Sequence, residues 1–309
     1  MKIIKPKFWD SEWSMISLLL SPLSLIFKAL ILLRNLITVS EKFNISVICV
    51  GNIYLGGTGK TPLSILINNE LKKIKKNPVI IKKFYKNQED EHKLIKKKTN
   101  LLILNKKRSR AIQDAIKKKF KVVILDDGFQ DHSIKKNLNI LCFNSKQLIG
   151  NGKVLPAGPL RESFNAIKRA KIIVINGDRN IMFEKKIINI SKNIKIFYSK
   201  YIPSNISEFK NKNILAFAGI GNPSNFFELL ERKGFNIKKR ISFPDHYKYT
   251  HMELKNIIND SKINKLDIIT TEKDHYRIKE YGFNNIKYLK IELQINKKKN
   301  LISQILKNL

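Results

Sequence analysis

Arginine is scarce in this chain, although the chain is strongly basic. Of its 309 residues, 60 are lysine or arginine and 25 are acidic, so the formal net charge is +35, yet just nine of the basic residues are arginine. Base readout and two-pronged phosphate binding rely mostly on arginine, and single-strand binding needs aromatic residues interleaved with it. The composition therefore argues against a nucleic-acid-binding protein. The lysine excess would still attract ATP, an acidic lipid headgroup or an anionic bilayer surface.

Cysteine is nearly absent as well. The two cysteines, Cys49 and Cys142, each lie inside a short apolar run. Such positions predict buried strand residues, and they exclude both a disulfide framework and a cysteine metal site. We therefore expect a protein body that folds in the reducing cytoplasm.

Long hydrophobic runs are limited to one, Trp13–Leu33. As a helix its roughly 21 residues would reach ~30 Å, about the thickness of a bilayer core, but Pro22 and Lys28 are costly inside a spanning helix. A signal peptide is an alternative, although no small-residue cleavage site follows the run. A helix packed on the protein's own core is another. We favour a helix that dips into the cytoplasmic leaflet, with Trp13 at the interface.

From residue 46 onward, short apolar runs alternate with polar segments of helical pattern. The strand candidates are Ser46–Val50, Pro78–Ile81, Leu101–Leu104, Val122–Leu125, Ile140–Phe143 and Ile172–Ile175. Helical segments such as Pro62–Lys73 and Ser109–Lys119 lie between them. This alternation predicts an α/β fold with a mostly parallel sheet.

A second, smaller alternation follows the polar stretch Tyr201–Lys212, which we interpret as a linker. Its strand candidates are Ile214–Ala218, Ile237–Phe243, Asp267–Thr271 and Ile286–Leu293. We therefore predict three parts: a hydrophobic, membrane-associating segment 1–36, a main α/β domain 37–205, and a smaller α/β domain 206–309 that closes over the active site.

A glycine-rich loop joins the first strand candidate to the first helical segment. From Gly51 to Thr61 it reads Gly-Asn-Ile-Tyr-Leu-Gly-Gly-Thr-Gly-Lys-Thr. In a strand–loop–helix context, glycines let backbone N–H groups turn toward bound phosphates. Lys60 would reach the β- and γ-phosphates of a nucleotide, and the Thr61 hydroxyl would bind Mg²⁺. The main domain is therefore predicted to be P-loop NTPase-like.

The residues of this loop that we expect to bind the nucleotide are Tyr54, Leu55, Gly56, Gly57, Thr58, Gly59, Lys60 and Thr61. Tyr54 stands where the strict pattern has glycine, and the neighbouring Gly56 and Gly57 offer flexibility in its place.

Two carboxylates, Asp126 and Asp127, end the apolar strand candidate Val122–Leu125. At the carboxyl end of a parallel strand they would lie beside the phosphate loop, where a metal ion binds. Thr61, Asp126 and Asp127 are therefore the predicted metal ligands. Up to this point the residues indicate a phosphotransferase or a P-loop GTPase/ATPase assembly factor. A GTPase should carry an Asn-Lys-x-Asp block, and Thr271–Asp274 lacks its asparagine.

Five further blocks resemble the tetraacyldisaccharide 4′-kinases of lipid A biosynthesis and occur in that family's order. They are Asp126–Gln130, Gly150–Glu162, Ala216–Pro223, Phe243–His246 and Thr270–Asp274. The resemblance implies ATP and Mg²⁺ as cofactors and transfer of the γ-phosphate to the 4′ hydroxyl of an acylated disaccharide 1-phosphate. It also implies work at the cytoplasmic face of the bacterial inner membrane, and it suggests no obligate protein partner.

The resemblance also assigns functional residues. The family uses an Asp–His pair, which falls on Asp90 and His246, so the expected catalytic residues are Asp90, His246 and Lys60. The Gly150–Glu162 block supplies the expected substrate-binding residues Asn151, Arg161 and Glu162.

The chain departs from the family pattern on the way to Asp90. Ile81–Lys86 stands in place of a Ser-Arg-Gly-Tyr block, with Lys83 for the arginine and Phe84 for the glycine. The stretch from Tyr85 to Asp90 is also short.

Overall fold

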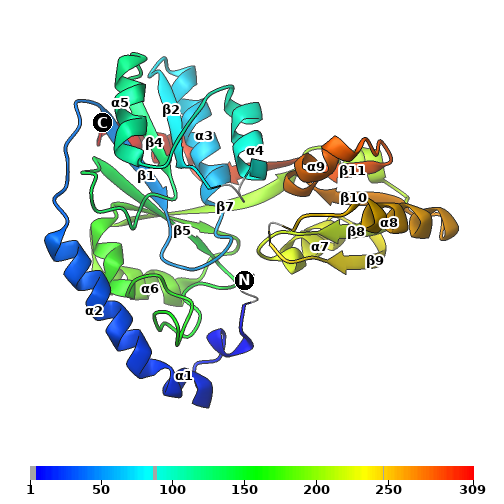
Figure 1. The fold of residues 1–309 in the computed structure, drawn as a ribbon, viewed down its shortest axis with the longest axis horizontal. Coiled ribbons are helices and arrows are strands. Elements are labelled where there is room, and N and C mark those ends of the chain that lie inside the picture. The colour runs from blue at the N-terminus through cyan, green and yellow to red at the C-terminus, as the bar shows by residue number, and fades with distance from the viewer. Residues whose placement is uncertain (1–4, 86–88, 246) are drawn as a thin grey trace. The chain divides into compact units, whose positions relative to one another are not determined.

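The computed structural model describes residues 5–85, 89–245 and 247–309, apart from the side chain of Asp90. The chain forms two compact units. The larger contains Lys5–Phe84, Thr99–Lys200 and Leu293–Leu309, and the smaller contains Tyr85–Lys98 and Tyr201–Glu292. Each unit is built around its own β-sheet with helices packed on it (Figure 1). The predicted fold class is thereby confirmed.

The larger unit contains an eight-stranded sheet. Its strands lie in the order β12 (Ile291–Ile295), β7 (Lys195–Pro203), β6 (Ile172–Asn176), β5 (Leu138–Asn144), β1 (Ser46–Gly51), β4 (Val122–Asp126), β2 (Pro78–Lys83) and β3 (Leu102–Asn105). All neighbours from β7 to β3 pair in parallel. The central strands are buried along their length, because a parallel sheet covered on both faces selects continuous apolar runs.

Helices connect and cover these strands. They are α1 (Met15–Leu19), α2 (Ser21–Ile37), α3 (Lys60–Lys73), α5 (Arg108–Lys117), α6 (Ile181–Ile190) and α10 (Lys298–Leu306), with short 3-10 helices η1 (Lys7–Trp9) and η2 (Phe164–Arg169). Helix α3 packs on β1, β2 and β4. Alternate strand residues such as Val123 share one buried cluster with Ile112 of α5 and Phe183 of α6.

The N-terminal helices α1 and α2 are held to the larger unit by serines, and they lie on its outside (Figure 1). Ser17 Oγ donates to Ala157 O (2.9 Å) and Ser24 Oγ to Val154 O (2.8 Å), while Ala157 N donates back to Ser24 Oγ (3.0 Å). The opposite side is apolar and exposed. Its residues are Trp13, Met15, Leu18, Leu19, Leu23, Leu25, Ile26, Leu30, Leu32, Leu33, Leu36 and Ile37.

The run Trp13–Leu33, which the sequence suggests as one helix, is divided in the structure. Helix α1 ends at Leu19 and α2 begins at Ser21, with Pro22 in its first turn, where the missing N–H of proline costs nothing. Within residues 5–85, 89–245 and 247–309, no helix has the length and hydrophobicity that crossing a bilayer requires.

The smaller unit has a four-stranded parallel sheet in the order β11 (Ile286–Leu289), β10 (Asp267–Thr271), β8 (Asn213–Ala218) and β9 (Asn236–Ser242). Its helices are α4 (Glu89–Thr99), α7 (Pro223–Arg232), α8 (His251–Ile263) and α9 (Glu272–Ile278), with η3 (Ile206–Phe209) and η4 (Lys279–Tyr281). Figure 1 labels these elements.

Helix α4 pairs with α9 inside the smaller unit. Lys98 Nζ lies 3.0 Å from Glu272 Oε1, Lys273 forms an ion pair with Glu91, and Lys97 Nζ lies 5.0 Å from the centre of the Tyr276 ring. In the sequence, this helix falls within the range 37–205 that is predicted for the main domain.

The chain returns to the larger unit at its C-terminus. The predicted run Ile286–Leu293 divides into β11 and β12, which belong to different sheets, and α10 packs on α3. In addition, β7 extends into the predicted linker as far as Pro203. The boundaries 1–36, 37–205 and 206–309 themselves stay a prediction.

Candidate active site

The phosphate loop runs from the end of β1 to the first residue of α3, Lys60. Gly59 takes the left-handed conformation just before the helix (φ 89°), which suits glycine. At the other end of the loop, a Cβ on Gly51 would stand 2.4 Å from Phe129 Cβ. The loop therefore needs glycine both to enter the helix and to pass the segment after β4.

The buried side-chain amide of Asn52, to which the sequence assigned no role, joins several residues of the loop. Asn52 Nδ2 donates to Tyr54 O (2.7 Å), to Gly56 O (3.3 Å) and to Thr58 Oγ1 (3.0 Å). Tyr54, which replaces a glycine of the strict pattern, is 1% exposed and packs in the core of the unit. Its ring is thus accommodated in the core and leaves the loop conformation intact.

The segment 153–161 braces the loop from the other side. Leu55 N donates to Pro159 O (2.9 Å) and Arg161 N donates to Ile53 O (2.7 Å). Tyr54 also forms an isolated β-bridge with Leu160. The same segment receives the serine hydrogen bonds of α1 and α2, so it is bonded to both the N-terminal helices and the phosphate loop.

Asp126 is fully buried and accepts three hydrogen bonds. Thr61 Oγ1 (2.9 Å) and Lys82 Nζ (2.7 Å) both donate to Oδ2, and Ser64 Oγ (3.1 Å) donates to Oδ1. Ser64 and Lys82 were missed from the sequence. Asp126 thus holds the Thr61 hydroxyl in place, and its own oxygens are already engaged.

Asp127 lies among cations beside the loop. Its left-handed backbone (φ 59°) turns the carboxylate toward Lys60 Nζ (3.7 Å) and Arg161 Nη1 (3.0 Å), and Arg108 Nη2 donates to its carbonyl oxygen (2.6 Å). Burial alone would raise the pKa of Asp127, but Lys60, Arg161 and Lys82 outweigh it and lower that pKa to about 2. The carboxylate is therefore ionised at neutral pH.

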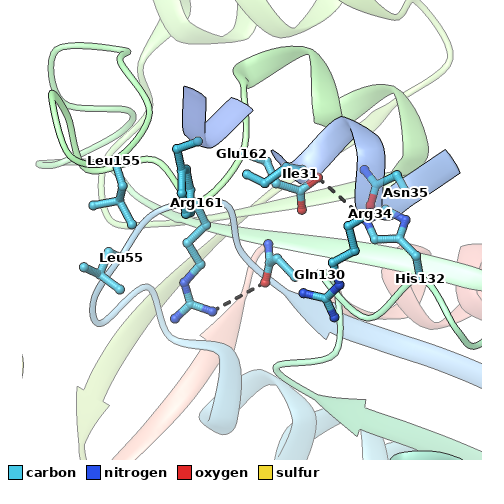
Figure 2. Close-up of a pocket in the computed structure, with 10 residues that line it drawn as sticks. Ile31, Arg34, Asn35, Leu55, Gln130, His132, Leu155, Arg161 and Glu162 are labelled. Carbon is cyan, nitrogen blue, oxygen red and sulfur yellow. Dashed lines mark hydrogen bonds and ion pairs between the residues drawn. The ribbon is translucent and has the colours of Figure 1, made fainter. Parts of the chain in front are cut away.

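A pocket of about 240 Å³ opens between α2 and the phosphate loop. Figure 2 shows Arg161, Gln130 and Arg34 from different segments around it. Its apolar lining residues are Phe27, Ile31, Leu55 and Leu155, and its polar ones are Arg34, Asn35, Gln130, His132, Arg161 and Glu162. Gln130 Nε2 donates to Asn52 O (2.8 Å) and so connects the pocket to the loop. The lining suits an amphiphile that carries negative charge.

The three predicted substrate-binding residues take different places. Arg161 lines the pocket and binds Asp127. Glu162 also lines it and forms an ion pair with Arg169 (2.5 Å). Asn151 Nδ2 instead donates to Ser17 Oγ (3.2 Å) and Ala157 O (2.9 Å), which fastens α1 to the segment after it. Substrate binding by any of them stays a prediction.

His132 lies 3.9 Å from Glu162 at the edge of the same pocket. Burial, followed by the charge of Arg169, lowers the pKa of His132. The neutral form of the imidazole is therefore favoured at pH 7.

Of the predicted Asp–His pair, His246 and the side chain of Asp90 lie outside the described residues. The backbone of Asp90 lies on α4. The segment that precedes His246 is tied to the sheet by a hydrogen bond from Phe243 N to Ala218 O (2.8 Å). The assignment of both catalytic residues stays a prediction.

The Thr271–Asp274 block begins α9 and has an internal role. Asp274 is fully buried and accepts from Gly219 N (3.0 Å), Tyr249 Oη (2.8 Å) and Thr271 Oγ1 (2.6 Å), besides its ion pair with Arg277. A carboxylate so enclosed is not placed to read a guanine base. In this structure the block joins the start of α9 to Gly219 and Tyr249.

P-loop proteins hold a nucleotide's phosphates and metal with a lysine at the end of the loop and a following hydroxyl fixed by a strand-terminal aspartate. Lys60, Thr61 and Asp126 have this arrangement, on a parallel sheet with the loop at a strand's carboxyl end. The larger unit is therefore a P-loop nucleotide-binding domain.

Comparison with known proteins identifies the family within this class of nucleotide-binding proteins. The family model for tetraacyldisaccharide-1-P 4′-kinase matches residues 16–309. Tetraacyldisaccharide 4′-kinase of Pelagibacter ubique is 44% identical over 99% of this chain and 98% of its own length. That of Rickettsia akari is 34% identical over 96% and 94%. The crystal structure of LpxK from Aquifex aeolicus, in complex with ATP, has a TM-score of 0.73 at 26% identity, covering 95% of this chain and 99% of that one. The chain belongs to the tetraacyldisaccharide 4′-kinase family.

Proposed function

We propose that this kinase transfers the γ-phosphate of ATP to the 4′ hydroxyl of a tetraacyldisaccharide 1-phosphate, a precursor of lipid A. The observation that carries the proposal is the amphiphilic pocket directly beside the phosphate loop. Leu55 belongs to both, and Arg161 lines the pocket while its backbone N–H donates to Ile53 of the loop. Family membership supplies the reaction, and the pocket supplies a place for a charged, acylated acceptor.

Lys60 and Arg161 would stabilise the phosphoryl group as it moves. Phosphoryl transfer needs little covalent help from the protein, and catalysis comes mainly from positioning and from cations aimed at the developing charge. Both side chains converge on Asp127, which holds them in place before the nucleotide binds. When ATP enters, its phosphate oxygens would take over part of these contacts.

The residues around Thr61 fit Mg²⁺, a hard cation that prefers oxygen ligands. The Thr61 hydroxyl is bonded to Asp126, and the Asp127 carboxylate lies 3.7 Å from Lys60, the residue before Thr61. Among the residues the structure describes, no group of three or more histidine, cysteine or carboxylate side chains could hold a metal by itself. We therefore propose that Mg²⁺ takes most of its ligands from ATP and water, and that it neutralises phosphate charge.

The metal proposal predicts a shift in Mg²⁺ dependence. We expect Asp126→Asn, Asp127→Asn or both to raise the Mg²⁺ concentration needed for half-maximal rate, because an amide is a neutral and poorer partner for a hard cation. Asp114→Asn, on helix α5, is the control. Unchanged Mg²⁺ curves for both variants would place these carboxylates outside the metal's surroundings.

We also propose that the enzyme works at the cytoplasmic face of the inner membrane. The serine side of α1 and α2 binds the protein, so the apolar side remains available to acyl chains. Helices with such an exposed apolar side bind at the bilayer interface through buried area as well as charge. The lysine-rich surface would add attraction to anionic lipid.

Vesicle binding tests the membrane proposal. We expect the full-length protein to stay on anionic phospholipid vesicles at about 1 M salt, where ionic attraction is screened within ~3 Å. The triple variant Leu19→Gln/Leu23→Gln/Leu30→Gln changes exposed positions and keeps the serine anchors, and we expect it to dissociate. Ile263→Gln, at an exposed apolar position on α8, is the control. Release of the unaltered protein by salt alone would show that lysine charge was the whole attraction.

The reaction itself is tested with purified acceptor. The protein, ATP and Mg²⁺ should phosphorylate a tetraacyldisaccharide 1-phosphate, and fragmentation in the mass spectrometer should place the new phosphate at the 4′ position. ATP hydrolysis without phosphorylated lipid, under conditions where an active family member turns over, would reject the proposal.

A further inference from the structure

Lys82 places a lysine ammonium inside the proposed metal site. Its side chain is buried, at the end of β2, and its Nζ lies 2.7 Å from Asp126 Oδ2. The register of the sheet produces this contact, because Lys82 and Asp126 are direct partners across β2 and β4.

The ammonium competes for the oxygen that a metal would approach. Thr61 Oγ1 and Lys82 Nζ contact the same atom, Asp126 Oδ2, so the ammonium lies within two hydrogen-bond lengths of the predicted metal ligand Thr61. Ser64 occupies the other oxygen. A divalent cation arriving alone would meet a positive charge in surroundings that screen it poorly, since both members of the pair are buried.

ATP changes this balance. Its triphosphate brings several negative charges to Lys60 and the loop, which offset the Lys82 ammonium and supply most of the metal's ligands. We propose that Lys82 is a positioning residue that neutralises Asp126 and keeps free divalent cations out of the site, so that the metal enters together with the nucleotide. This inference rests on the proposed ATP and Mg²⁺ site.

Binding of Mn²⁺ alone to the nucleotide-free protein is the measurement, followed by electron paramagnetic resonance. We expect Lys82→Met, which keeps the length and removes the charge, to bind Mn²⁺ at least about tenfold more tightly than the unaltered protein, since a buried carboxylate without its partner attracts a cation. Lys82→Arg should bind as weakly as the unaltered protein. Lys121→Met, at the opposite end of β4 and exposed, is the matched control.

Loss of one partner of a buried ion pair also destabilises a protein. Lys82→Ser is therefore a second neutral variant, with a small hydroxyl in place of the ammonium. Thermal unfolding with and without Mn²⁺ gives an independent readout. Mn²⁺ should raise the unfolding temperature of the Met or Ser variant more than that of the unaltered protein. A lysine that merely joins two strands would lower stability and leave the Mn²⁺ response unchanged.

The same titration with ATP present separates the two proposals. Suppose that Mn²⁺ binds all variants when ATP is present, and that without ATP the neutral variants bind Mn²⁺ no more tightly than the unaltered protein does. The role of Lys82 is then rejected, while the metal site stands. If Mn²⁺ fails to bind the unaltered protein even with ATP, the metal site itself is rejected.

Discussion

Lys60→Ala is expected to reduce kcat by ~10²–10³-fold, the usual effect of removing one preorganised electrostatic stabiliser from a transition state. Lys60 begins α3, and its ammonium is held near the phosphate position by Asp127 at 3.7 Å. Without it, the charge that develops on the transferred phosphoryl group lacks its principal protein cation. Steady-state phosphorylation of the lipid acceptor measures the effect.

Lys72→Ala, at the far end of the same helix, is the matched control and should leave turnover unchanged. Both variants should show the same far-ultraviolet circular dichroism, because neither side chain is part of the core. If the Lys60→Ala protein retained more than about a tenth of the original turnover, an effect below the range for such residues, the loop would not be the catalytic phosphate site.

Asp90→Ala and His246→Ala form the second large expected effect. A sugar hydroxyl is a weak nucleophile, and a residue that accepts its proton contributes about 10²–10⁴-fold. We propose that one of the two accepts the proton and the other orients it. Each substitution should then lower kcat with a much smaller effect on the KM for ATP. The double variant should lose little more than the worse single one, because residues that act as a unit are not additive.

The position of helix α4 bears on whether an Asp90–His246 pair would need domain closure to form. The predicted boundaries place Asp90 in the P-loop domain and His246 in the smaller domain, so a pair formed across them would require the two domains to close. The ion pairs of α4 with α9 put its backbone in the smaller unit, which also contains the segment on either side of His246. If the fold reduction in kcat of the double variant equalled the product of the two single reductions, the residues would act separately. A near-normal kcat for Asp90→Ala would show that the acid lies elsewhere.

Much of the fold could be predicted because its signals are local. The continuous apolar runs Ser46–Val50 and Val122–Leu125 became β1 and β4 within one residue, since burial on both faces leaves little tolerance for polar residues. The loop between β1 and α3 was equally clear, because glycine spacing reports backbone conformation directly. That Asp126 and Thr61 meet at the carboxyl ends of the strands followed from the prediction of a parallel sheet.

What the sequence did not predict depends on partners far apart in the chain. In the sequence, Lys82 looks like a solvent-exposed residue at the end of a strand. In the structure the strand register places it opposite Asp126. In the sequence, Arg108 looks like an exposed basic residue at the start of a helix. In the structure its guanidinium donates to the carbonyl oxygen of Asp127. The position of α4 in the smaller unit depends on such partners too, because Glu91 and Lys98 form ion pairs with Lys273 and Glu272 of α9.

The segment 153–161 has a mechanical consequence. On one side it is hydrogen-bonded to Ser17 and Ser24 of the N-terminal helices, and on the other to Ile53 and Leu55 of the phosphate loop. If the helices tilted in a bilayer, these hydrogen bonds would couple that tilt to the loop. Once docked, the kinase would present its phosphate donor at a set height and angle above the lipid surface, and an acceptor could stay embedded by its acyl chains while its headgroup reaches the loop.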